Sequence, residues 1–289
     1  MAKEVGNLNV NTIGLAACDN GNAGSYYIDD NMFIFINTKT FGPSSLGIGN
    51  PYRVEEGRVI MVTNGSVDMY INLEEYHVCS KTVLVFLPDT IFEIKGYSEN
   101  LNLQFFSFSD LPVIPATHKA IVMPLDEDKW KLTSEYFNLI WHEVHQSTVL
   151  HDAIKYLQTA CLLELKRWNE KEEVRVKDKI TRQQRIFHNF LDLVTKDGFR
   201  NRKVDYYASK LCLTPNYLSN VVKGESGMTV MQWINRYAIQ QIKVMLKYSD
   251  LSISDIADRI NIDNPSFFSK FFKRETGMTP NEYRNSGNR

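Results

Sequence analysis

The sequence predicts a two-domain α+β protein, in which an antiparallel β-barrel with helices precedes an all-α domain that holds two helix-turn-helix units. Three observations lead to this prediction. Short apolar runs separated by turn residues fill the first part of the chain, the apolar spacing becomes helical near residue 126, and one phrase occurs twice, as GESGMTVMQWI at 224–234 and as RETGMTPNEYR at 274–284. The 289 residues, of which 43% are hydrophobic, suffice for two modest cores.

The first domain, residues 1–170, has the pattern of several short strands. Apolar and polar residues alternate from Ser66 to Leu73 after the pair Asn64-Gly65, which predicts a half-buried strand that follows a two-residue hairpin. Many short strands at such spacing favour a small antiparallel barrel or sandwich. The further strand candidates are MFIFINTKTF at 32–41, KTVLVFLPDTIFEIKGY at 81–97, interrupted at Pro88-Asp89, and LNLQFFSFS at 101–109.

Two helices are predicted between residues 126 and 170, and the second has two apolar stripes. One stripe can pack on the sheet or on the preceding helix, and the other can pair with a second subunit to make a homodimer. Burial of both stripes within one subunit fits the spacing equally well. The first stripe is Ile154, Leu157, Cys161, Leu165 and Trp168, and the second is Tyr156, Ala160 and Leu163.

A charged linker is expected at residues 171–180, and the net charge of the chain changes sign there. Residues 178–289 hold 18 Lys and Arg against 11 Asp and Glu, which gives +7, whereas residues 1–177 hold 15 against 23, which gives −8. A basic carboxyl-terminal part behind an acidic body favours a module that faces nucleic acid.

The carboxyl-terminal domain, residues 181–289, contains an internal repeat. The segment YASKLCLTPNYLSNVVKGESGMT aligns with IADRINIDNPSFFSKFFKRETGMT, with Asp263 as one extra residue. Each copy predicts a short packed helix, a tight connection and a second helix that begins at an N-cap followed by proline. The signals are Tyr207, Ala208, Leu211, Thr214-Pro215, Gly227 and Thr229 in the first copy, and Ile256, Ala257, Ile260, Asn264-Pro265, Gly277 and Thr279 in the second.

The second helix of each copy is the candidate for reading DNA. Its buried set is expected to be Tyr217, Leu218, Val221 and Val222 in the first copy, and Phe267, Phe268, Phe271 and Phe272 in the second. The opposite face has acids only near the helix ends, as a major-groove helix requires, because Asn can read adenine and Lys can read guanine. The candidate DNA-binding residues are Asn216, Ser219, Asn220, Lys223, Ser266, Ser269, Lys270 and Lys273, with Arg274 expected on phosphate.

Residues 180–284 resemble the AraC/XylS-type transcription regulators. The resemblance lies in the two repeat copies, in PSFFSKFFKRETGMTPNEYR, and in the linker-helix phrase WINRYAIQQIKVMLKYSDLSISDIA. It implies two helix-turn-helix units joined by a long helix and a cupin-like amino-terminal domain for sensing and dimerisation. It also implies that double-stranded promoter DNA and RNA polymerase are partners and that a small-molecule effector can control the protein. Activation and repression fit the sequence equally well.

The chain departs from the family pattern at three places. Asn261-Ile262 stand where the turn of the second unit often has Gly-Phe, and asparagine tolerates the left-handed conformation that such a turn needs. Ala238 replaces a common arginine of the linker helix, and Ile242 replaces a common alanine. These two replacements bear on how the two units pack against each other.

An enzymatic or metal-binding amino-terminal domain is the alternative. His77 stands alone among the strands, and WHEVH at 141–145 is not the H-E-x-x-H pattern of zinc enzymes. Because no phosphate loop, nucleophile elbow or acid pair occurs, we expect no catalytic residue, metal or cofactor. The aromatic residues Phe33, Phe35, Tyr52, Tyr70, Phe86, Phe92, Phe105 and Phe106 could line an effector pocket or fill a core.

The location of the protein is expected to be cytoplasmic. The sequence has no apolar run long enough for a membrane span and no secretory leader pattern. Its four cysteines lie far apart, which favours reduced thiols over a disulfide framework.

Overall fold

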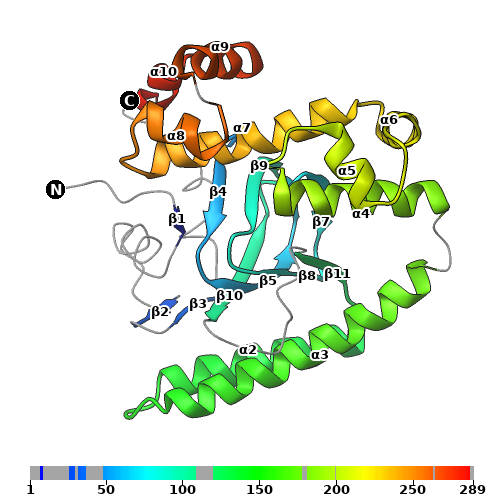
Figure 1. Ribbon diagram of the computed structural model, residues 1–289. Helices are drawn as coiled ribbons and strands as arrows, with labels where there is room; N and C mark the ends of the chain where they lie inside the picture. The colour runs from blue at the N-terminus through cyan, green and yellow to red at the C-terminus, as the bar shows by residue number, and fades with distance from the viewer. Residues whose placement is uncertain are drawn as a thin grey trace. The chain divides into compact units, whose positions relative to one another are not determined.

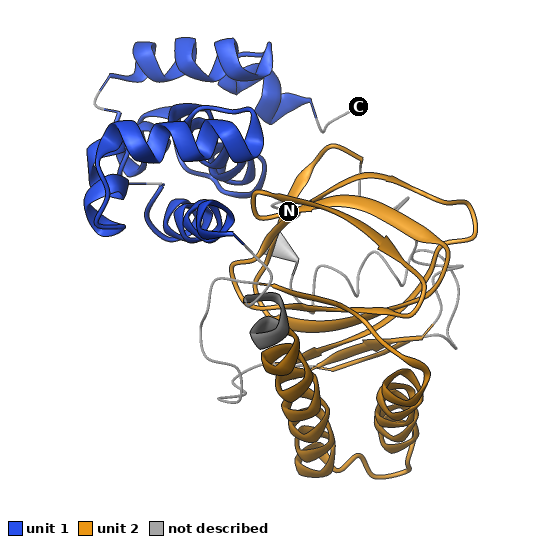
Figure 2. Cartoon of the chain, turned by 90° about the vertical axis from the view of Figure 1, so that its right-hand side faces the viewer, with its two compact units in different colours: residues 1–7, 179–289 blue, residues 8–178 orange. Residues whose placement is uncertain are grey.

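The chain divides into two compact units, one of residues 8–178 and one of residues 1–7 and 179–289 (Figure 2). We refer to them as the amino-terminal and the carboxyl-terminal unit. The computed structural model describes residues 7–8, 26–29, 32–36, 48–108, 120–177, 181–198, 200–262 and 264–286.

The amino-terminal unit is built from two antiparallel sheets followed by two helices. The five-stranded sheet has the order β1 (Asn7–Leu8), β4 (Pro51–Val54), β9 (Ile91–Tyr97), β6 (Ser66–Ile71) and β7 (Glu74–Cys79). The six-stranded sheet has the order β11 (Ile121–Pro124), β8 (Thr82–Phe86), β5 (Gly57–Asn64), β10 (Asn102–Phe108), β3 (Phe33–Phe35) and β2 (Tyr26–Ile28). The mixed α+β class is therefore confirmed.

The predicted hairpin at Asn64-Gly65 is wrong. Although β5 ends at Asn64 and β6 begins at Ser66, β5 pairs with β8 and β10, whereas β6 pairs with β7 and β9 in the other sheet. Gly65 has φ 72° and lies so close to Ser98 and Leu101 that a Cβ atom would come within 2.7 Å of the Leu101 backbone. This glycine therefore turns the chain from one sheet into the other. The alternation after it is confirmed, because Val67, Met69 and Ile71 are buried in β6.

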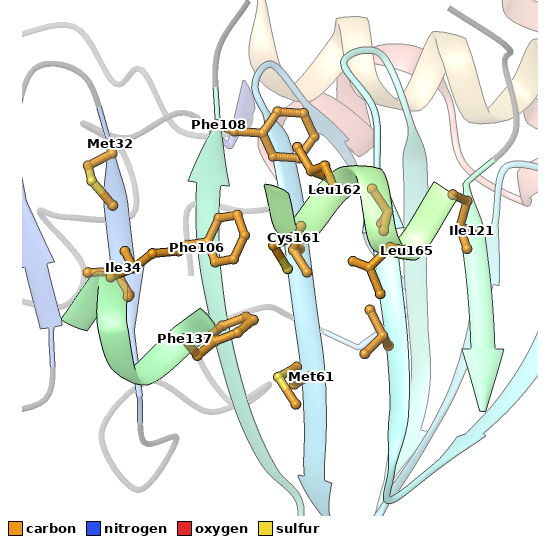
Figure 3. Close-up of a cluster of buried hydrophobic side chains, with 14 of the residues drawn as sticks. Met32, Ile34, Met61, Phe106, Phe108, Ile121, Phe137, Cys161, Leu162 and Leu165 are labelled. Carbon is orange, nitrogen blue, oxygen red and sulfur yellow. The ribbon is translucent and has the colours of Figure 1, made fainter. Parts of the chain in front are cut away.

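A hydrophobic core of this unit lies between the six-stranded sheet and helices α2 (Glu127–Val144) and α3 (His151–Lys177). Figure 3 shows Ile34 and Phe106 from the sheet beside Phe137 from α2. The rings of Phe106 and Phe137 have centres 4.8 Å apart. The first predicted stripe of α3 supplies Ile154, Cys161, Leu165 and Trp168 to this core, with Leu157 packed against it.

The opposite face of the six-stranded sheet is aromatic. The rings of Phe33 and Phe105 have centres 5.1 Å apart, and Phe86 of β8 lies 5.3 Å from Phe92 of β9, which belongs to the five-stranded sheet. The two sheets therefore meet through aromatic contacts. Arg58 is buried in this layer with its Cζ 5.8 Å from the centre of the Phe105 ring, and burial lowers its pKa to about 10.

Between residues 181 and 286, the regular elements that the structure describes in the carboxyl-terminal unit are helices (Figure 1). Its helices are α4 (Arg182–Asp197), α5 (Val204–Lys210), α6 (Pro215–Ser226), α7 (Val230–Tyr248), α8 (Ile253–Arg259), α9 (Pro265–Thr276) and α10 (Pro280–Asn285). Because α3 continues to Lys177, residues 171–177 of the expected linker are helical. No helix in the described part of the chain is long and apolar enough to cross a membrane.

Candidate nucleic-acid interface

Each repeat copy folds as two helices joined by a tight turn. Tyr207 and Ala208 of α5 are buried, as are Ile256 and Ala257 of α8. The chain then turns at Cys212, with φ 56°, and at Asn261, with φ 54°. These left-handed residues occupy equivalent places, so the replacement of the usual glycine by Asn261 leaves the turn intact.

The second helix of each unit starts as the sequence predicted. The side chains of Thr214 and Asn264 accept hydrogen bonds from backbone N–H groups of the first turn, and a proline follows each of them. This arrangement satisfies donors that a helix start leaves unpaired and fixes where α6 and α9 begin. The positions of their first exposed residues are therefore set by local chemistry.

The repeated phrase forms the same turn in both units. Ser226 donates to the carbonyl of Val222 at 2.7 Å, and Thr276 donates to the carbonyl of Phe272 at 2.8 Å. Gly227 and Gly277 follow with φ 70° and 80°. Thr229 and Thr279 then form capping boxes with Gln232 and Glu282 at the start of the next helices. The duplicated sequence is thus a duplicated helix end and helix start.

The predicted site residues lie on the outer faces of α6 and α9. Asn216, Asn220 and Lys223 are exposed on α6, and Ser219 is half-buried. Ser266, Lys270, Lys273 and Arg274 are exposed on α9, and Ser269 is half-buried. The structure therefore brings the members of each set onto one helix face, with Leu218, Val221 and Val222, or Phe268, Phe271 and Phe272, buried behind them.

Two members of the expected buried sets are exposed instead. Tyr217 is 37% exposed, and Phe267, its counterpart in the second copy, is 59% exposed. The prediction was wrong because the four positions of each set span a wide arc of the helix, and the first of them lies at the edge of that arc, beyond the buried side. Both aromatic side chains thus join the faces that carry the candidate DNA-reading residues.

The segment that precedes the first helix-turn-helix unit contacts the second helix-turn-helix unit directly. The side-chain amide of Asn261 donates to the carbonyl of Arg200 at 2.9 Å. Arg202 lies with its Cζ 4.3 Å from the centre of the Phe271 ring of α9 and donates to Asn235 of α7 at 2.7 Å. The segment before the first unit is therefore fixed against the second unit. The residue pattern gave no sign of the contacts with the second unit, which join residues 61 positions apart (Arg200 and Asn261) and 69 positions apart (271 − 202, for Arg202 and Phe271).

The packing of α7 accommodates the two departures from the family pattern, since Ala238 and Ile242 are both fully buried. Trp233 near the start of this helix donates to Ser226 at 2.9 Å, which ties α7 to the end of α6. Toward its other end, Ile242, Met245 and Leu246 pack in the core of the second unit. A single helix thus contributes to both units.

Electrostatics distinguishes the cations of this unit. Burial lowers the pKa of the Arg202 guanidinium, and the nearby Glu275 carboxylate opposes that shift. Arg274 pairs with Glu275 at 2.6 Å and lies with its Cζ 5.5 Å from the centre of the Phe271 ring. Arg202 is therefore partly buried and held by contacts within the protein, whereas the side chains of Lys223, Lys270 and Lys273 are exposed to solvent.

The metal-ligand candidates of the amino-terminal unit are engaged with other groups. His77 contacts Asp68 at 2.6 Å, His142 contacts Gln146 at 2.8 Å, and His145 contacts the carbonyl of Trp141 at 2.8 Å. Within the residues that the structure describes, no three His, Cys, Asp or Glu side chains are grouped as a metal site would require.

Comparison with known sequences gives a match in the repeat region. A family model described as a helix-turn-helix domain matches residues 207–286. The HTH-type transcriptional activator RhaR of Salmonella schwarzengrund is 23% identical over 248 residues, which cover 83% of each chain. The arabinose operon regulatory protein of Escherichia coli is 31% identical over 77 residues, which cover 27% of this chain and 26% of that protein.

Other matches cover less of the relative. The uncharacterized HTH-type transcriptional regulator YtdP of Bacillus subtilis is 26% identical over 148 residues, 49% of this chain, and the match spans only 19% of that protein. These relatives are named as transcription regulators and not as enzymes, in agreement with the sequence-based expectation.

Solved structures with likeness to this chain include ToxT of Vibrio cholerae in an apo form, with a TM-score of 0.40 and 13% identity over 89% of this chain and 97% of that chain. The carboxyl-terminal domain of AraT, a response regulator from Geobacillus stearothermophilus, has a TM-score of 0.35 and 26% identity over 37% of this chain and 88% of that chain.

Proposed function

We propose, from the premise that this chain belongs to the AraC/XylS-type transcription regulators, that it binds promoter DNA sequence-specifically through the outer faces of α6 and α9. These helices would lie in successive major grooves on one side of the duplex. RNA polymerase would be the second partner, and the protein would act in the cytoplasm.

The observation that carries this proposal is the pair of equivalent, exposed faces on α6 and α9. Their hydrogen-bonding side chains are amides, hydroxyls and ammonium groups, and the acids Glu225 and Glu275 lie only at the ends. A surface helix that serves only solubility usually mixes acids with bases. Faces of the observed kind match the donors and acceptors of base edges and the negative phosphates.

The length of α7 supports reading in two grooves. Its 19 residues correspond to a rod of roughly 28 Å at about 1.5 Å per residue. Neighbouring major-groove segments on one side of DNA lie about 34 Å apart, and each unit extends beyond its end of the helix. One chain would therefore contact two patches of bases about 10 base pairs apart.

The test is a comparison of selected binding sites and footprints for the full chain and two variants. Asn220→Ala should relax base preference in one patch only, and Lys270→Ala in the other only, because each residue lies on a different helix. Asn281→Ala and Lys210→Ala are matched controls, since both side chains are exposed and lie outside these faces. If Asn220 and Lys270 affect the same base pairs, or if one patch alone is protected, the two-groove proposal fails.

We further propose that the protein is a homodimer held by α3. Among the described residues, the second stripe of this helix is largely exposed, with Tyr156 73% and Leu163 50% exposed and half-buried Ala160 between them. A stripe opposite the buried face of a long helix is suited to a partner helix. Together with the acidic charge of this part of the chain, it supports a subunit contact that leaves the basic unit available for DNA.

A small-molecule effector would bind between the sheets of a cupin-like amino-terminal unit. The aromatic layer around Phe33, Phe86 and Phe105 with the buried guanidinium of Arg58 supports this placement, because effector sites are mostly apolar with few polar groups. A thermal-shift screen of sugars, aromatic acids and fatty acids with the full chain tests it. A ligand that binds only the folded state raises Tm, and the absence of any shift would remove the effector from the proposal.

A further inference from the structure

We propose that Tyr217 and Phe267 are specificity residues that contact thymine 5-methyl groups, one in each of the two major grooves. This inference rests on the proposed binding of DNA by α6 and α9. It adds an apolar component to a recognition scheme that otherwise consists of amides, hydroxyls and ammonium groups.

The two residues occupy the same place in the two repeat copies. Each is the third residue of its helix, and the backbone N–H groups of Tyr217 and Phe267 donate to the N-cap side chains of Thr214 and Asn264 at 3.3 and 3.2 Å. The cap therefore fixes their backbone. In a helix-turn-helix unit it is the first turns of the second helix that approach base edges, so this position is favourable for contact with a base.

Their exposure is not explained by packing within the unit. The described large hydrophobic residues of the carboxyl-terminal unit with substantial exposure are Tyr217, Met231, Phe267 and Met278, and only the two aromatic ones lie on α6 and α9. Their immediate successors Leu218 and Phe268 are fully buried, so the core contacts of these turns are made by the neighbouring positions. Both repeat copies therefore have an exposed aromatic ring at this position.

The chemistry of the DNA major groove indicates which group the two aromatic rings contact. The 5-methyl group of thymine is the apolar group that base pairs present in the major groove, and a phenylalanine side chain can cover it. Phe267 has no hydrogen-bond donor, so a phosphate or a polar base edge would not suit it. The net charge of +7 in residues 178–289 supplies the attraction that brings these rings to the duplex.

The residues beside Tyr217 and Phe267 predict which bases lie next to the contacted thymines. Asn220 lies one turn beyond Tyr217 on the same face, and Lys270 has the same relation to Phe267. Because asparagine suits adenine and lysine suits guanine, we expect the Tyr217 thymine in an A·T-rich patch and the Phe267 thymine beside a G·C pair. The two patches thus have different expected compositions.

The experiment replaces each thymine of a selected duplex by deoxyuridine, which removes the methyl group alone. For the full wild-type chain, deoxyuridine at one or two positions in each patch should weaken binding roughly three- to fivefold, the value of burying one methyl group. In Phe267→Ala, deoxyuridine should no longer weaken binding in the patch contacted by α9 but should still do so in the patch contacted by α6. In Tyr217→Ala, deoxyuridine should no longer weaken binding in the α6 patch but should still do so in the α9 patch. Tyr217→Phe should retain the effect.

Met231→Ala is the control, because Met231 is exposed but lies on α7. Phe267 is 59% exposed, so Phe267→Ala should keep the wild-type Tm, whereas Tyr217 is 37% exposed and Tyr217→Phe keeps its ring in place. A variant with a lowered Tm is replaced by the serine substitution. Deoxyuridine effects that are absent in the wild type, or unchanged in Tyr217→Ala and Phe267→Ala, would overturn the inference. A wild-type chain that binds no duplex at all would instead overturn the proposed function.

Discussion

At the scale of single residues, the left-handed glycines after α6 and α9 fix how each helix ends. Gly227 and Gly277 have positive φ, and no described atom lies within 4 Å of a Cβ atom added to them. Space is therefore available for a side chain, and only the backbone conformation favours glycine. The end of each helix, and hence the angle at which the next helix leaves, depends on this conformation.

Gly227→Ala should lower the free energy of unfolding by about 1–2 kcal/mol, because alanine is strained in the left-handed region. Gly224→Ala is the matched control, since Gly224 lies inside α6 with equally open surroundings. There alanine should raise the free energy of unfolding by about 1 kcal/mol through its better helix propensity. Urea denaturation of the full chain, followed by circular dichroism, measures both. Equal effects of the two substitutions would contradict the assigned conformation of Gly227.

The sequence predicted these residue roles well because caps and left-handed glycines depend on neighbours within a few positions. Thr214, Asn264 and Gly277 all act as expected. The exposure of Phe267 could not be predicted, because helical periodicity orders positions around an axis without saying how far the partner helix reaches. Arg202 was missed for a related reason: its contact with Phe271 depends on how the two units pack.

At the scale of elements, α3 has one side packed in the core and another side with exposed hydrophobic residues. Its buried side was predictable from spacing, since Ile154, Cys161 and Leu165 are in the core. The error at Asn64-Gly65 shows the limit of such patterns, because the turn residues predicted that the chain reverses but not which strands then pair. Pairing between sheets is decided by long-range contacts that a local pattern does not contain.

Leu163→Glu should convert the proposed dimer into a monomer while the subunit stays folded. The side chain is already half exposed, so the charge costs little in the free subunit, whereas burial of an unpaired carboxylate in a helix interface is costly. Lys155→Glu is the control, because Lys155 is exposed on α3 outside the stripe. Sedimentation of the full chain at micromolar concentration measures the change. An unaltered dimer in Leu163→Glu would exclude the stripe from the interface.

At the scale of the whole molecule, charge is segregated between the first and the last part of the sequence. The chain as a whole has a net charge of −1, yet residues 178–289 have +7 and residues 1–177 have −8. Overall charge therefore underestimates the attraction to DNA, which depends on the local field. Composition predicted this division, because charge counts need no knowledge of the fold.

The affinity of the full chain for its DNA site should fall steeply with salt, as in a protein that displaces several counterions, with a log–log slope steeper than about −3. Lys273→Ala should make this slope shallower by about 1, since one phosphate neutralisation is lost. Lys171→Ala should leave the slope unchanged, because Lys171 belongs to α3 of the amino-terminal unit. Binding titrations from 50 to 200 mM salt measure the slopes. A slope near zero would mean that the basic unit does not contact the backbone.

The contacts of Asn261 with Arg200 and of Arg202 with Phe271 have a consequence for the torsional phase of the DNA site. Two helix-turn-helix units joined by a flexible linker could follow bases that are displaced around the DNA axis. Units that are fixed to each other cannot. One base pair inserted between the patches rotates the far patch by about 35°, since a turn of DNA takes 10–10.5 base pairs. Sites in a genome should therefore conserve the number of base pairs between the patches more strictly than the identity of the bases there.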